Sequence, residues 1–207
     1  MRVSPVILEG LVTTINADGT VNIAPMGPTV DAEMHSLVLR PFPTSTTLAN
    51  LQRAGVGVFH VTDDVELLAH AAIGRLETMP RLAPAGVIEG QILADACRWY
   101  AFRVRSIDDS GERVVLEAEI VGQGVQREFF GFNRAKHAVL EAAILATRVA
   151  ILPLTDIQAE FARLAALVYK TGGPAEHRAF LFLDDFLRAV VAAEDEEAIA
   201  SESQSEL

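Results

Sequence analysis

The sequence predicts an α+β protein, with an antiparallel β-barrel of six strands in residues 1–130 and a C-terminal helical subdomain in residues 131–192. Three observations lead to this prediction. Runs rich in β-branched residues, separated by turn signals, fill most of the first 130 positions. Only short helical segments interrupt these runs, which favours an antiparallel barrel over a parallel sheet. After Phe130 the apolar residues recur with a helical period.

Turn residues bound the six expected strands. The segment Asn16–Gly19 is a hairpin signal, and a second turn is expected at residues 108–112. Pro25 marks an edge or a bulge, because proline has no N–H to donate to a sheet ladder. The strands are expected at residues 3–15, 20–27, 35–41, 56–61, 92–107 and 114–129.

Two short helices are expected among the strands, and three longer ones after them. The first short helix, residues 44–55, has a hydroxyl-rich start and ends at Gly55; the second runs from Asp63 to about residue 73. Residues 75–89 are expected to be a loop. The longer helices are expected at residues 134–150, 156–169 and 174–192, and the acidic end, residues 193–207, is expected to be disordered.

Composition excludes several classes of protein. The chain has 207 residues, half of them apolar, and a formal net charge of −11, which disfavours binding to nucleic acid or to anionic lipid. No uncharged run approaches the roughly 20 residues of a membrane span, and no cleavable signal pattern is evident. The single cysteine, Cys97, is expected in the core and fits a reducing cytoplasm. Histidine spacing indicates no metal site.

The helix expected from residue 134 begins with two cations, Arg134 and Lys136. Cations at this end of a helix oppose the helix dipole, so a bound anion would explain them. Asn133 is expected to cap the helix, and the free backbone N–H groups of the first helical turn would add hydrogen-bond donors. The alternative is a partly exposed helix that needs no ligand.

That alternative rests on charges further along the same helix. Arg134, His137, Glu141 and Arg148 share a narrow stripe, while small and apolar residues fill the rest of the helical wheel. Pairs between His137 and Glu141, and between Glu141 and Arg148, would satisfy these charges without a ligand. The narrow stripe also predicts that the helix is packed on two or more sides.

A second candidate anion site lies at the start of the first short helix. Four hydroxyl residues, Thr44, Ser45, Thr46 and Thr47, follow a strand that ends in Arg40. One hydroxyl is enough to cap a helix, and the others suit the acceptor oxygens of a phosphate group. The alternative is a solvated cap with spare threonines. The two candidate sites support one another only if the fold brings them together.

These segments resemble the flavin reductase-like and pyridoxamine-phosphate-oxidase-like split barrels. The resemblance rests on the strand "NIAPMG", on "RPFPTSTTLANL", and most specifically on "EFFGFNRAKHAVLEAAILATR", which is similar to domain-of-unknown-function family 447. It covers nearly the whole chain up to about residue 190. It implies an FMN-binding split β-barrel and, with it, a homodimer.

The resemblance also implies a set of cofactor-binding residues. The residues on the phosphate side would be Arg40, Ser45, Thr46, Thr47 and Asn50. Those facing the flavin ring would be Asn22, Ala24, Pro25 and Met26, with His60 continuing the pocket wall. Those at the second helix start, meeting the phosphate or the polar edge of the ring, would be Asn133, Arg134 and Lys136.

Three classes of function remain open at this stage. The first is an FMN-dependent oxidoreductase that uses a reduced nicotinamide or a small organic substrate. The second is a flavin carrier or redox sensor without turnover, and the third is a binder of another phosphorylated ligand on the same fold. His137 and Glu141, one helical turn apart, are the only candidates for acid–base catalysis, and a structural role is the alternative for them.

Overall fold

The computed structural model describes residues 6–111 and 113–205, and in it the chain folds into two compact units. The first, called here the β unit, comprises Met1–Asp64 and Glu77–Phe130. The second, called here the helical unit, comprises Val65–Leu76 and Gly131–Leu207. The sequence predicts the boundary between strands and helices at residues 130–131, but it assigns residues 65–76 to the barrel. This segment contains α2 (Val65–Ala72) and belongs to the helical unit.

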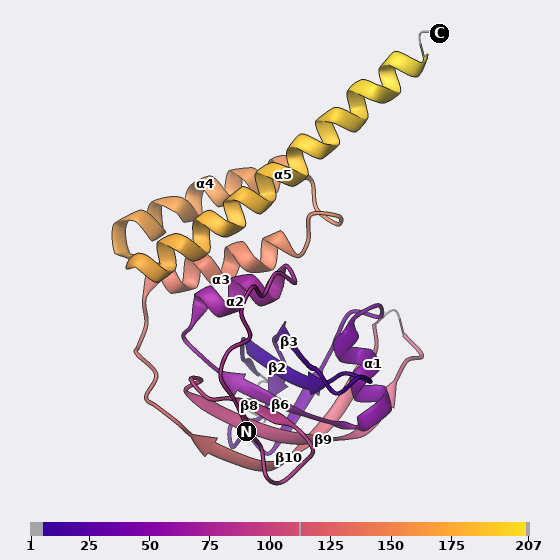
Figure 1. The fold of residues 1–207 in the computed structure, drawn as a ribbon, viewed down its shortest axis with the longest axis vertical. Coiled ribbons are helices and arrows are strands. Elements are labelled where there is room, and N and C mark those ends of the chain that lie inside the picture. The colour runs from indigo at the N-terminus through magenta and orange to yellow at the C-terminus, as the bar shows by residue number, and fades with distance from the viewer. Residues whose placement is uncertain (1–5, 112, 206–207) are drawn as a thin grey trace. The chain divides into compact units, whose positions relative to one another are not determined.

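The β unit is built on a curled antiparallel sheet, which Figure 1 shows. The sheet has eight strands in the order β1-β4-β5-β10-β9-β6-β2-β3. A two-stranded sheet, β7-β8, accompanies it. The strands are β1 (Val6–Ile7), β2 (Gly10–Ile15), β3 (Val21–Met26), β4 (Thr29–Val30), β5 (Ser36–Leu39), β6 (Val56–Val61), β7 (Leu82–Pro84), β8 (Gln91–Leu93), β9 (Arg98–Asp108) and β10 (Val115–Val125). The predicted count of six strands is therefore too low.

Two of the expected strands divide because the chain changes partners. Within residues 3–15, β1 pairs with β4, whereas β2 pairs with β3 and β6. The expected strand at residues 92–107 divides at a turn, which is closed by a 3.1 Å hydrogen bond from the N–H of Ala96 to the carbonyl oxygen of Leu93. The expected loop 75–89 contains β7, which pairs with β8. Hydrophobic runs do not reveal such changes of partner.

The core of the β unit lies between the sheet and α1 (Thr46–Ala54). Leu48 and Leu51 on α1 pack with Val12, Phe59 and Phe102 of the sheet. Gly55 ends α1 with a φ of 67°, a left-handed conformation that glycine adopts without strain. The predicted helix start and end are both confirmed.

The helical unit contains α2, α3 (Arg134–Ala146), α4 (Leu154–Thr171) and α5 (Pro174–Ser205). Helix α3 packs against the other three, and its small residues, among them Ala135, Ala138 and Ala142, are fully buried. The prediction of a helix packed on several sides is confirmed.

Helix α5 is the longest element, with 32 residues, and continues to Ser205. The expectation of a disordered end from residue 193 is therefore corrected as far as Ser205. Alanine and glutamate dominate this stretch, and both have high helix propensity. In the part of the chain that the structure describes, no helix has the length and apolar character needed to cross a membrane.

Candidate functional site

A buried polar network joins α1 to the strands β2 and β3. Asn22 Nδ2 donates to Thr14 Oγ1 at 3.2 Å and to Thr47 Oγ1 at 3.0 Å. Asn50 Nδ2 donates to Thr14 Oγ1 at 3.0 Å and to Asn16 Oδ1 at 2.8 Å. Thr14, Thr47 and Asn50 are at most 5% exposed. Because a buried polar group needs its partners, this network fixes α1 on the sheet.

The network brings together three residues that the resemblance assigns to FMN, namely Asn22, Thr47 and Asn50. They come from two separate segments of the sequence, so their convergence agrees with the grouping. The side-chain amides of Asn22 and Asn50, however, donate to oxygens within the network, on Thr14, Thr47 and Asn16. We therefore expect these three residues to hold the ligand-binding segments in place, and not to supply the main contacts to the ligand.

The exposed start of α1 offers the donors that the network does not use. Ser45 caps the helix, its Oγ accepting from the N–H of Leu48 at 3.2 Å. Thr44 and Thr46 are exposed. Backbone N–H groups in the first turn of a helix have no intrahelical partners, so they can donate to a ligand. The helix start thus combines hydroxyl groups, N–H groups and the positive end of a dipole.

Arg40 adds a cation to the same unit. It follows β5, its side chain is exposed, and Nη1 donates to Thr29 Oγ1 at 3.2 Å. This bond to a neutral hydroxyl leaves the charge of the guanidinium uncompensated by the partner that it contacts. A bound anion would compensate it.

Strand β3 forms one edge of the eight-stranded sheet, which confirms the prediction made from Pro25. Its residues pair only with β2 in that sheet, with Ala24 opposite Val12 and Pro25 opposite Leu11. Ala24, Pro25 and Met26 are each partly buried. The outer edge of such a strand carries backbone groups that a sheet neighbour does not occupy, so a flat polar ring can bond there.

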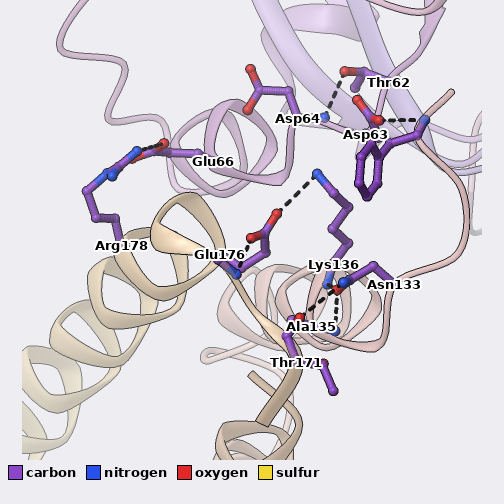
Figure 2. Close-up of polar contacts among 12 residues, drawn as sticks. Thr62, Asp63, Asp64, Glu66, Asn133, Ala135, Lys136, Thr171, Glu176 and Arg178 are labelled. Carbon is purple, nitrogen blue, oxygen red and sulfur yellow. Dashed lines mark hydrogen bonds and ion pairs between the residues drawn. The ribbon is translucent and has the colours of Figure 1, made fainter. Parts of the chain in front are cut away.

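In the helical unit, the start of α3 is confirmed as a capped helix end. Asn133 Oδ1 accepts from the N–H groups of Ala135 and Lys136, at 2.8 and 3.1 Å. Its Nδ2 donates to the carbonyl oxygen of Thr171 at 3.1 Å, as Figure 2 shows. The amide of Asn133 thereby joins the start of α3 to the end of α4.

Lys136 has an anionic partner inside the helical unit. Its Nζ lies 3.1 Å from Oε1 of Glu176, a residue only 8% exposed (Figure 2). Glu176 Oε2 also accepts from the N–H of Gly173 at 2.8 Å and so caps α5. Burial would raise the pKa of the Glu176 carboxyl, but these two hydrogen bonds outweigh it and hold the pKa below its usual value. The carboxylate therefore stays charged beside Lys136.

The remaining polar stripe of α3 is less connected. Arg134 and His137 are exposed, and Glu141 is partly exposed. Among the described residues, the structure records no hydrogen bond or ion pair between His137 and Glu141. Arg148 lies beyond the end of α3 at Ala146. That Arg134 and Lys136 lie close to the start of α1 stays a prediction.

His60 does not line a pocket wall, which corrects the expectation for this residue. It is fully buried, its Nδ1 lies 3.3 Å from the carbonyl oxygen of Leu11, and its Nε2 accepts from the N–H of Leu93 at 3.0 Å. Burial lowers the pKa of His60 to about 4, and the bond to Leu11 only partly opposes this. A neutral imidazole thus links β6 to β2 and β8.

Asp63 is a structural carboxylate that sequence patterns present only as a helix start. It is 6% exposed and pairs with the guanidinium of Arg127. It also accepts a hydrogen bond from the N–H of Phe130 at 2.9 Å, drawn as a dashed line in Figure 2. These contacts hold the last residues of the β unit against the end of β6. An acidic residue two positions after the end of a buried strand is the signal for such a role. Cys97, 1% exposed, lies 3.7 Å from Asp63 and is a core residue, as predicted, but in a turn rather than a strand.

Two family models match the chain. The family model described as "Protein of unknown function (DUF447) N-terminal domain" matches residues 8–127, and the model described as "Protein of unknown function (DUF447)" for the C-terminal domain matches residues 133–184. No protein with a curated description matches the chain.

Several solved structures are similar to the chain to different degrees. The FMN-bound protein MM1853 from Methanosarcina mazei is similar with a TM-score of 0.76 and 22% identity, over 87% of this chain and 95% of that one. The 2-nitrobenzoate 2-nitroreductase NbaA from Pseudomonas fluorescens gives 0.48 and 20%, over 60% and 66%. Flavoredoxin of Desulfovibrio vulgaris gives 0.47 and 12%, over 59% and 71%.

The fold and these matches define the class of protein. It is an α+β protein with a curled, split-barrel type of antiparallel sheet and a helical unit. The chain belongs to the DUF447 family, whose two domain models together span most of its length.

Proposed function

We propose that this protein binds FMN and acts as an FMN-dependent oxidoreductase. The observation that carries the proposal is the start of α1, where exposed hydroxyl groups, first-turn N–H groups and the positive end of the helix dipole coincide. The phosphate of FMN is close to dianionic at neutral pH and has several acceptor oxygens, so it matches this donor set. The FMN-bound family member MM1853 supports the choice of ligand.

The residues of the β unit fit the two ends of the cofactor. Thr44, Thr46 and the N–H groups of the first turn of α1 would hold the phosphate, with Arg40 supplying charge. The free edge of β3 at Ala24–Met26 would receive the polar edge of the ring. The buried network of Asn22, Thr47 and Asn50 would keep these two parts at a fixed spacing.

Bound FMN would supply the hydride or electron transfer, and the protein would supply orientation and electrostatics. Preorganised N–H donors at the strand edge and the helix start cost no reorganisation when negative charge develops near them. The electron donor would be a reduced nicotinamide or a small organic substrate. Lack of turnover by an FMN-loaded protein would indicate the second function, a flavin carrier or redox sensor.

The test is a titration of the purified full-length chain with FMN, followed by anaerobic addition of NADH or NADPH. The expected results are saturable binding and bleaching of the visible flavin band by one of the two nicotinamides. Binding without bleaching by any donor would retain the cofactor and exclude the nicotinamide-dependent reaction. Absence of binding would overturn the proposal.

A matched pair of variants locates the phosphate. Thr46→Ala removes an exposed hydroxyl at the start of α1, and Thr155→Ala removes an exposed hydroxyl in the first turn of α4. Losing a hydrogen bond to a charged group costs about 1.5–3 kcal/mol, so Thr46→Ala should weaken FMN binding roughly 10- to 100-fold. Thr155→Ala should leave the dissociation constant unchanged. Equal effects of both variants on FMN binding would exclude the start of α1 as the phosphate site.

A further inference from the structure

A groove of about 350 Å³ runs between α4 and α5 on the surface of the helical unit. Phe161, Phe180 and Leu187 contribute to it from buried positions, each at most 3% exposed. The small side chains of Ala162 and Ala165 leave it open. The result is an apolar hollow at a helix–helix boundary, where a side chain from another helix can insert.

The exposed stripe of α4 beside this groove carries no charge. Gln158, Ala162, Ala165 and Tyr169 follow one another at intervals of four, three and four residues and therefore share one face of the helix. Tyr169 is 65% exposed. An uncharged stripe is unusual for a solvated helix in a chain with a net charge of −11. The stripe has the character of a contact face rather than of a solvated one.

The corresponding stripe of α5 is self-complementary in charge. Leu181, Asp184, Arg188 and Val191 lie at intervals of three, four and three residues, so they also share one face. Leu181 is 47% exposed. A two-fold axis midway between Asp184 and Arg188 is also midway between Leu181 and Val191. In an antiparallel pair of α5 helices, this axis would set each aspartate beside the arginine of the other copy and each leucine beside a valine.

We propose that the α4–α5 face, consisting of the groove and these two stripes, binds the same face of a second copy of this chain about such a two-fold axis. The self-complementary charges select this occupant, because an isologous contact requires that a surface patch match itself. Asp184 and Arg188 already form an ion pair within one copy, at 2.7 Å. Across the axis the four charges would alternate in sign. The proposal does not depend on FMN.

Charge exchange tests this directly in the full-length chain. Asp184→Arg makes both charged positions of the face positive, and Arg188→Asp makes both negative. Each variant alone would place like charges across the axis, so sedimentation equilibrium should show self-association at least about tenfold weaker than in the wild type. An equimolar mixture of the two variants should associate again, because a positive face then meets a negative one.

The mixture separates the contact between copies from the ion pair within one copy, since that internal pair is absent from both variants. Glu160→Arg and Arg163→Glu provide the control, because they exchange a comparable surface ion pair of α4 that does not line the groove. These controls should associate like the wild type. Circular dichroism establishes that each variant is folded.

Three results would overturn the proposal. They are a wild-type chain that stays monomeric throughout, single variants that associate as well as the wild type, and a mixture that does not recover association. The second result would place any dimer contact elsewhere, on the β unit for example. A small molecule or an unrelated protein found in the groove of a monomeric chain would contradict the proposal equally.

Discussion

Helices α1 and α3 both begin at a capping side chain, but the polar residues next to the two caps serve different purposes. At α1, Thr47 and Asn50 enter a buried network, while Thr46 stays exposed. At α3, Asn133 bonds to the end of α4 and Lys136 to the carboxylate of Glu176. Arg134 stays exposed beside them.

The difference shows that a helix start rich in polar residues is not by itself an anion site. At α1 the fold uses the neutral residues and leaves hydroxyl and N–H groups for a ligand. At α3 it supplies its own anion to one of the two cations. A positive charge at the start of a helix is unfavourable, and Glu176 relieves it for Lys136 without any cofactor.

The largest effect is expected from His60, the most deeply buried polar residue that the fold uses. The pKa of His60 is about 4 in the folded protein and 6.5 ordinarily, so the unfolded chain binds the additional proton. The stability that the protein gains from keeping His60 neutral is therefore fully present above pH 6.5 and is lost as the pH falls towards 4. At about 1.4 kcal/mol per pH unit, the loss approaches about 3 kcal/mol.

Urea unfolding at a series of pH values measures this loss. The variant His60→Gln should show a flatter dependence of the free energy of unfolding on pH between 6.5 and 4. If the wild type and the variant had parallel pH dependences, His60 would not be the group responsible. The comparison of slopes stands even if the variant is less stable at every pH.

The second effect tests the network at α1. Asn50→Ala removes two donated hydrogen bonds and leaves Thr14 and Asn16 with fewer partners in a buried setting. Unsatisfied buried groups cost about 1–3 kcal/mol, so a decrease of about 2–3 kcal/mol in the free energy of unfolding is expected. Thr46→Ala on the same helix should change it by less than about 0.5 kcal/mol. Equal losses would contradict the division between buried and exposed hydroxyl residues.

The third effect tests the ion pair at α3. Lys136→Ala leaves the carboxylate of Glu176 nearly buried and without its cation, and a loss of about 2 kcal/mol is expected. Arg178→Ala is the control, because it breaks an ion pair with Glu66 in which the arginine is 61% exposed. That loss should stay below about 1 kcal/mol. If FMN binding also falls in Lys136→Ala but not in Arg178→Ala, the α3 start contributes to the cofactor site as the sequence predicts.

Much of the fold can be predicted from the sequence, because turns and caps are local. Gly55, the Asn16–Gly19 turn and the cap at Asn133 depend on a few neighbouring residues, and all three occur as predicted. The number of strands cannot be predicted in this way, because β1 and β2 belong to one apolar run and separate only through their different partners.

In the candidate site, too, only the features that depend on neighbouring residues can be predicted from the sequence. A capping role for Ser45 follows from its position before a helix. The partners of Thr47 and Lys136 do not, since Asn22 is 25 residues from Thr47 and Glu176 lies on another helix. The spacing of Gly173 and Glu176 at the start of α5 is a capping-box signal for the carboxylate, but nothing local connects it to Lys136.

The central claim is that the start of α1 binds the phosphate of a flavin. Calorimetric titration of the full-length chain with FMN and with riboflavin, which lacks the phosphate, tests it most directly. The account predicts that FMN binds at least about tenfold more tightly than riboflavin, and that Thr46→Ala reduces this ratio. Equal affinities for the two flavins, or a ratio that Thr46→Ala leaves unchanged, would contradict it.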